Sequence, residues 1–461
     1  MSPPRLPIVL FALVAMALSV RAQVIDRTGD DRTRAAGNAA EEPGAVEPDL
    51  LPGNPTPPDD YFAPPELPLP LADGPQVSTP TEDQPEEVAA TPRRFRYAIT
   101  VDVRGVYDDN VNLSSGADRK SDFYAAVIPQ LTLGIGDVLE RQENFISVNY
   151  SPSGYYYFEN SDFSTLEHIG RLEGQWRIRR VVLTLSQDWQ SVQSSNLNVA
   201  NPGGGFSNQT NLDIGGRRRV TTYATHFSAA APLTGKTTLR AGADYTISDP
   251  EGLIGSDTLT GTLGADYQYG PKLSLGAGFS AGKQSVEDPN PDTTFQQANL
   301  RATYQLTGKI AATGSAGVEF RQSEDANQTQ ISPVFAVALA YAPFDGTQLD
   351  ISANRRTQNS ASAFGQDFTS TQLVVSARQR FLQRIYFNLS VGIQNQTYFS
   401  TATGMNSDRN DNYYFLAPGI DVRITEFWFA GVFYTYREND SSLAFNTFDD
   451  NQYGIRTTLR F

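Results

Sequence analysis

Apolar and polar residues alternate one by one through most of the chain beyond residue 95. In one segment Leu239, Ala241, Ala243, Tyr245 and Ile247 share a face, and the residues between them are polar or glycine. The same alternation recurs in many later segments, for example at 385–394 and 453–461. Because the side chains of a strand point alternately to its two sides, this period of two predicts strands with two unlike faces.

The alternation predicts about 18 strands. Most span about 12–16 residues, whereas strands of globular sheets typically have about 5–6, so these are long enough to cross a bilayer at a tilt. We therefore predict an all-β fold, a transmembrane antiparallel up-and-down β-barrel. The expected strands are 95–107, 122–135, 143–158, 164–178, 181–192, 217–231, 237–248, 256–269, 272–285, 293–306, 309–322, 329–342, 347–358, 366–381, 384–397, 411–424, 427–439 and 448–461.

The connections between these strands alternate in length. Long connections follow odd-numbered strands, for example 193–216 and 398–410, and short ones follow even-numbered strands, for example Arg179-Arg180 and Gly270-Pro271. Outer-membrane barrels have long external loops and short periplasmic turns. An even strand number then predicts that both termini are periplasmic.

Two segments precede the expected barrel, which covers residues 93–461. Residues 1–22 contain Arg5, an apolar stretch and a small-residue end at Ala22, which is the organisation of a secretory signal peptide. Residues 23–92 hold 14 of the 28 prolines, with 15 acidic and 3 basic side chains. This composition favours extended chain and cannot bury a core, so we predict a disordered periplasmic linker.

Composition excludes several function classes. The chain has no cysteine and only two histidines, His168 and His226, which rules out thiol chemistry and leaves little material for a metal site. We expect neither a cofactor nor a bound metal. The net charge of −15 arises mostly in residues 23–92, and no dense basic patch indicates a nucleic-acid partner.

The opening of the expected barrel resembles a known family. The segments Gly105 to Leu113 and Asp122 to Leu131, followed by recurring paired strands, are similar to the start of barrels in the β-barrel porin 2 family. The resemblance covers roughly residues 95–461. It implies a bacterial outer-membrane protein surrounded by lipid, and some family members are associated with exopolysaccharide production or export. The C-terminal face resembles the terminal signal read by the barrel assembly machinery: Tyr453, Ile455, Thr457, Leu459 and Phe461.

Charged side chains on the strands are expected to face the lumen, because near the bilayer midplane they cost about 2–4 kcal/mol on the lipid side. The alternation assigns fourteen arginines, Arg219 among them, and eight carboxylates to the lumen face, a balance of +6. Guanidinium groups bind carboxylates and phosphates, so these arginines predict a path for anionic solutes. Alternatively they pair with acids across strands, as Arg240 with Asp244 or Asp266, and stiffen the wall. The candidate path residues are Arg240, Arg301, Arg356, Arg378, Arg380, Arg423 and Arg456.

One arrangement deserves a test as a catalytic site. His226 and Ser228 share a strand face, as in the His-x-Ser arrangement of outer-membrane phospholipase A. The sequence offers no accompanying motif, and Ser228 runs into the turn-like segment 229–232, so we do not expect an enzyme. His168, beside Glu167, is interpreted as an interfacial side chain.

Two glycine-rich segments also need an interpretation. Gly276, Gly278 and Gly282 fall mid-strand on the lumen face with no helix after them, so we interpret them as space for bulky neighbours and not as a nucleotide-binding loop. The run Gly203 to Gly205 lies in the longest external loop and indicates a mobile segment or one that folds into the pore.

Two functions from different classes follow. About 18 strands leave an aqueous lumen, which favours a channel for anionic or saccharide solutes that assists exopolysaccharide export. The long acidic linker favours instead a structural anchor, in which a plugged barrel holds a periplasmic tail against envelope partners.

Overall fold

The computed structural model describes residues 95–136, 138, 144–194, 212–307, 309–325, 329–344, 346–402 and 407–461. The expected signal peptide, the expected linker and Gly203 to Gly205 lie outside the described residues.

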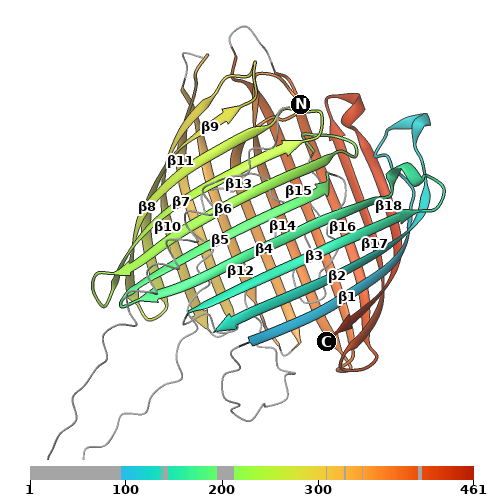
Figure 1. Cartoon of the computed structure of the whole chain (residues 1–461), viewed down its shortest axis with the longest axis horizontal. Coiled ribbons are helices and arrows are strands. Elements are labelled where there is room, and N and C mark those ends of the chain that lie inside the picture. Colours follow the sequence, from blue (N-terminus) through green and yellow to red (C-terminus); the bar gives the residue numbers. More distant parts are fainter. Residues whose placement is uncertain are drawn as a thin grey trace, which may run out of the picture. The chain divides into compact units, whose positions relative to one another are not determined.

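Eighteen strands form one closed antiparallel β-barrel (Figure 1). Each strand pairs with its neighbours in sequence, and β1 closes the barrel onto β18. This confirms the predicted fold and strand number, and no strand end differs by more than three residues from its expected position. The strands are β1 Phe95–Asp108, β2 Asp122–Gly136, β3 Phe145–Tyr157, β4 Thr165–Ile178, β5 Val181–Gln193, β6 Arg219–Pro232, β7 Thr237–Pro250, β8 Ser256–Gly270, β9 Leu273–Val286, β10 Thr293–Thr307, β11 Ile310–Ser323, β12 Thr329–Tyr341, β13 Thr347–Asn359, β14 Gln366–Phe381, β15 Ile385–Ser400, β16 Asn410–Arg423, β17 Trp428–Ser441 and β18 Phe448–Arg460.

The connections differ between the two ends of the barrel, which we call the long-loop end and the short-turn end. Within the described residues, three single-turn 3-10 helices lie in long-loop connections: η2 Gly116–Asp118, η3 Ser161–Phe163 and η4 Ala444–Asn446. At the short-turn end the backbone of Phe461 exchanges two hydrogen bonds with Ile99, of 2.8 and 3.0 Å, so the beginning of β1 and the C-terminus are adjacent. None of the helices in the described residues is long and apolar enough to cross a membrane.

The two faces of the wall differ in polarity, as the alternation predicts. Outward side chains are largely apolar and exposed; Leu263, Leu300 and Ile455 keep 66%, 69% and 66% of their surface accessible. Inward positions are mostly polar, and many are buried against other polar groups, such as Glu173 and Gln284. A soluble protein would bury such an apolar band, whereas a barrel in a membrane exposes it to lipid.

Strand β11 requires a glycine at position 317, opposite Asn299 of β10. A Cβ atom at Gly317 would lie 2.2 Å from the carbonyl oxygen of Ala298, which is backbone and cannot rotate away. We expect Gly317→Ala to lower the free energy of unfolding in urea by about 1–3 kcal/mol, because the two strands must separate. Gly154→Ala is the matched control, since nothing lies within 4 Å of a Cβ there. Equal stability of the two variants would contradict the close approach.

Candidate functional site

The seven candidate path arginines all occupy inward positions, but they do not form one site. Arg240 and Arg301 lie in the wall of β7 and β10, and Arg356 lies opposite Ser370 near the long-loop end. The other four, Arg378, Arg380, Arg423 and Arg456, lie toward the short-turn end of β14, β16 and β18.

Arg240 and Arg301 share one carboxylate. Arg240 Nε donates to Asp266 Oδ2 at 2.6 Å, and Arg301 Nη2 donates to Asp266 Oδ1 at 3.1 Å. Glycines make room for this group, because a Cβ at Gly276 would lie 2.1 Å from Asp266 Oδ1 and one at Gly278 would lie 2.9 Å from Arg301 Nη1. These two arginines therefore follow the wall-stiffening alternative.

The arginines of the short-turn end form what we call the mouth cluster: Arg378, Arg380, Arg423, Arg456 and Arg460, with Asp421, Tyr386 and Phe429. Arg456 binds Asp421 through Nε at 2.7 Å and Nη2 at 2.5 Å. Five arginines and one carboxylate leave the cluster with a formal charge of +4. It is therefore a strongly positive part of the inner wall.

Aromatic rings separate the arginines of the mouth cluster. The Arg378 guanidinium lies 4.8 Å from the centre of the Tyr386 ring, and that of Arg460 lies 4.6 Å from the Phe429 ring. The two rings are 6.5 Å apart. Cation–π contacts hold each guanidinium by its face, whereas its N–H donors lie in the plane of the group and point to its edge.

The charge balance of the whole inner wall differs from the sequence prediction. Arg219 was assigned to the lumen, but Val220 occupies the inward position, and Arg219 points outward to Thr165 Oγ1 and Ser191 Oγ at 2.8 and 3.1 Å. Arg437 faces inward and was missed, as were five acids at the long-loop ends of strands. Fourteen arginines and thirteen carboxylates occupy inward strand positions, a balance of +1 and not +6. The missed acids are Asp108, Asp122, Glu167, Asp411 and Asp450.

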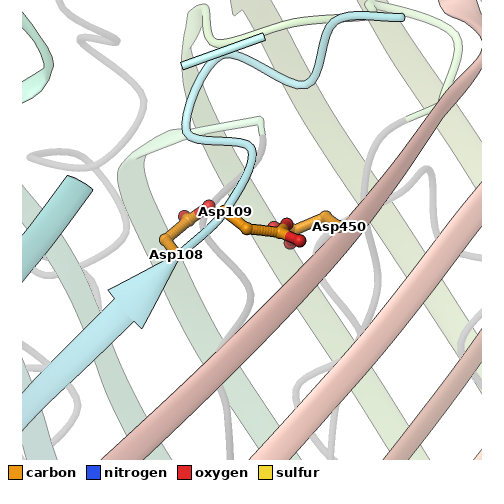
Figure 2. A group of neighbouring side chains, drawn as sticks. All are labelled: Asp108, Asp109 and Asp450. Atoms are coloured by element: carbon orange, nitrogen blue, oxygen red, sulfur yellow. The ribbon is translucent and has the colours of Figure 1, made fainter. Parts of the chain in front are cut away.

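Three of these aspartates lie close together at the long-loop end. Figure 2 shows Asp108 at the end of β1, and the carboxylates of Asp109 and Asp450 facing each other. One oxygen or more from each of the three lies within 4.8 Å of the others.

Arginines already neutralise this acidic group. Arg217 reaches Asp108 at 3.4 Å, Arg119 reaches Asp109 at 2.7 Å, and Arg437 Nε donates to Asp450 Oδ2. Burial lowers the pKa of Arg119, but its hydrogen bonds to Asp109 and Asp449 outweigh burial and leave that pKa raised. A cation would have to displace the three guanidinium groups. The group is therefore a junction that joins two outer loops to β18.

The two histidines lie on opposite faces of the wall. His226 faces inward between two carboxylates, with Nδ1 2.7 Å from Asp244 Oδ1 and Nε2 3.7 Å from Asp188 Oδ2. Its ring thus lies between acids of β5 and β7, the two strands that pair with β6. His168 faces outward and its Nδ1 shares a 2.8 Å hydrogen bond with the hydroxyl of Tyr150.

The predicted assembly residues occupy the outward face of β18. Tyr453 and Ile455 are more than half exposed, and Phe461, 65% exposed, lies beside Phe427 with ring centres 6.4 Å apart. Thr457 Oγ1 accepts a 2.7 Å hydrogen bond from the Trp428 indole. Together with Leu459 these residues form one continuous stripe at the seam where the barrel closes.

No protein-family model matches this sequence, and no curated protein matches it. Among solved structures, it is similar to the outer membrane protein OpdK from Pseudomonas aeruginosa at 12% identity, covering 79% of this chain and 98% of that one with a TM-score of 0.42. OccAB3 from Acinetobacter baumannii is 9% identical, covering 79% of this chain and 99% of that one with a TM-score of 0.41. The FrpB iron transporter from Neisseria meningitidis is 10% identical, covering 74% of this chain and 62% of that one with a TM-score of 0.39. At this identity the similarity is one of barrel architecture, and no residue role is taken from these proteins.

Proposed function

We propose that this protein is a channel of a Gram-negative outer membrane that passes small anionic solutes and assists the export of an acidic exopolysaccharide. Both termini are then periplasmic, and the mouth cluster lies at the periplasmic opening. The observation that carries the proposal is the concentration of five arginines against one aspartate in the mouth cluster, whereas the other inward strand positions carry nine arginines and twelve carboxylates.

The wall supports insertion in a membrane. Its outward face exposes large apolar side chains, and the pairing of β1 with β18 closes the sheet into a barrel. A spanning structure must satisfy its backbone internally, and a closed barrel does so. Eighteen strands also enclose a lumen wider than side chains alone fill.

The mouth cluster supports selection of anions. Field lines concentrate in a lumen with low-dielectric walls, so a local charge of +4 raises the concentration of anions at the opening. The planar guanidinium group fits carboxylate and phosphate better than a lysine does. Tyr386 and Phe429 add flat apolar surfaces between the arginines, which suit the faces of sugar rings in an acidic saccharide chain.

The test is the reversal potential of single channels across a salt gradient. We expect the wild type to prefer anions, and Arg378→Gln/Arg380→Gln to lower the anion/cation permeability ratio. The difference should shrink with added salt, because the Debye length falls from about 10 Å at 0.1 M to about 3 Å at 1 M. Arg119→Gln/Arg219→Gln removes the same charge away from the lumen and should leave the ratio unchanged. A cation-selective wild type would overturn the proposal.

A second function is favoured by a separate observation. Part of the β13–β14 hairpin leans inward past β12 and contacts the inner face of β9 and β11. A barrel blocked in this way would serve as a structural anchor for the acidic N-terminal segment. Planar-bilayer recordings distinguish the two, since an anchor gives no current at any voltage or salt concentration.

A further inference from the structure

The wall has a seam between β12 and β13. These strands share seven paired positions, from Phe335 opposite Arg355 to Tyr341 opposite Leu349. Toward the long-loop end, Thr329–Val334 pair with β11 on one side and, within the described chain, have no partner on β13 on the other. Pro333 lies in this edge, and proline suits an edge because it has no N–H to donate.

Beyond the seam, β13 and β14 remain paired with each other and bend into the lumen, and β14 stays paired with β15 as far as Gln366 opposite Ser400. We call residues 356–370 the tip. Asn359 Oδ1 accepts a 2.5 Å hydrogen bond from Gln284 of β9, and Asp367 Oδ2 accepts one of 2.5 Å from Arg321 of β11. By alternation Asn359 and Asp367 would point outward, yet Asp367 is 3% exposed. The outer face of the tip therefore packs against the inner face of β9 and β11, in the wall segment on the other side of β12.

A second set of contacts holds the end of the tip. The Asp213 carboxylate, in the loop before β6, accepts hydrogen bonds from Ser360 Oγ at 2.7 Å, the Ala361 N–H at 2.6 Å and Ser362 Oγ at 3.0 Å. The Ile254 N–H also donates to the Ala361 carbonyl at 3.0 Å. All these contacts are polar, so water can replace each of them when the tip leaves.

The vacant edge of β12 offers the tip a second position. Continuing the observed register places Val334 opposite Arg356, and Ser332 opposite Gln358. The faces agree, because Val334 and Ser332 point inward on β12 and Arg356 and Gln358 are inward positions of β13. Pairing there would give backbone partners to β12 in exchange for the lost lumen contacts. The end of β15 would move together with the tip, because residues 366–370 are paired with residues 396–400.

We infer that the tip is a gate, which closes the lumen when latched to Asp213, Gln284 and Arg321 and opens it when it pairs with the edge of β12. This inference rests on the proposed channel function. The unpaired edge of β12 lies at the long-loop end of the barrel. This place agrees with the inference, because an unpaired strand edge is tolerated outside the hydrocarbon layer but not within it.

Two disulfide locks test the gate, and the native chain has no cysteine to interfere. Ser332→Cys/Gln358→Cys joins the tip to β12, since directly opposite residues of an antiparallel pair have Cα atoms within bonding range. Asp213→Cys/Ser360→Cys fixes the tip in the lumen. The four single-cysteine variants are the controls, and loss of maleimide labelling reports each bond.

We expect both disulfides to form under mild oxidation. The β12 lock should raise single-channel conductance above that of the wild type, and the Asp213 lock should abolish most of the current, with both effects reversed by dithiothreitol. If the Ser332→Cys/Gln358→Cys thiols never join while the wild type conducts, the gate is wrong and the channel stands. If both locks form and the barrel conducts in neither state, the channel proposal fails and the gate with it.

Discussion

Replacing Arg437 by alanine should lower the free energy of unfolding of the barrel by about 3–5 kcal/mol. Arg437 is fully buried, and its Nε donates to Asp450 Oδ2. Gln452 Nε2 lies 3.2 Å from both Asp450 and Asp108, so two buried carboxylates share this site. Removal of the Arg437 guanidinium leaves the two carboxylates in a low-dielectric environment with less positive charge to balance them. Urea unfolding in lipid vesicles, followed by tryptophan fluorescence, measures the loss.

Arg119→Ala is the matched control for this prediction. Arg119 also bridges two carboxylates, Asp109 at 2.7 Å and Asp449 at 2.8 Å, but its side chain is 30% exposed. Solvent screens such a pair, so the expected loss is about 0–1 kcal/mol. Replacing both buried partners by apolar residues, Arg437→Met/Asp450→Leu, should recover part of the loss. Equal losses for the two alanine variants would mean that burial does not decide the contribution.

The strands were predictable because a barrel wall imposes one simple rule over its whole length. Every strand has lipid on one side and lumen on the other, so the period of two persists from β1 to β18 and locates each strand within three residues. The alternation of long and short connections is the second rule, and it distinguishes the long-loop end of the barrel from the short-turn end. Both rules act locally along the chain, and neither requires knowledge of a distant contact.

The charge of the lumen was less predictable, because it depends on whether each charged residue at a strand end points inward or outward. Arg219 is the first residue of β6, and a shift of one position moves it between lumen and exterior. Asp108, Asp411 and Asp450 lie at or near the loop boundary, where the alternation no longer distinguishes strand from loop. The predicted excess of +6 therefore becomes +1, and the positive charge that matters is its local concentration in the mouth cluster.

The fold of the tip depends on contacts that no local pattern encodes. Asp213, Gln284, Arg321 and Asp367 are far apart in sequence, and only the closed barrel brings them together. One signal was present. Thr357, Asn359 and Asp367 put polar side chains on the outward face, next to polar inward residues, so this hairpin end has no side suited to lipid. A strand end that is polar on both faces indicates a segment that leaves the membrane wall.

Phe461→Asp should prevent most of the protein from assembling in the outer membrane, as judged by the amount of heat-modifiable barrel. Phe461 completes the outward stripe of the closing strand, and its backbone pairs with Ile99 where the barrel shuts. Because Phe461 lies at the short-turn rim, its effect on recognition by the assembly machinery can be distinguished from its effect on the stability of the folded barrel. A charged side chain at the membrane interface costs only about 0–1 kcal/mol, far too little to unfold an 18-stranded barrel.

A large loss of assembled protein would therefore report failed recognition by the assembly machinery, before folding is complete. Phe344→Asp is the matched control, because Phe344 lies at the same end, is 73% exposed and belongs to the β12–β13 connection and not to the closing strand. We expect that variant to reach wild-type levels, and Phe461→Tyr to do so as well, since it keeps the ring. Wild-type amounts of Phe461→Asp would show that assembly reads another part of the chain, and equal losses for Phe344→Asp would show that it reads the apolar rim as a whole.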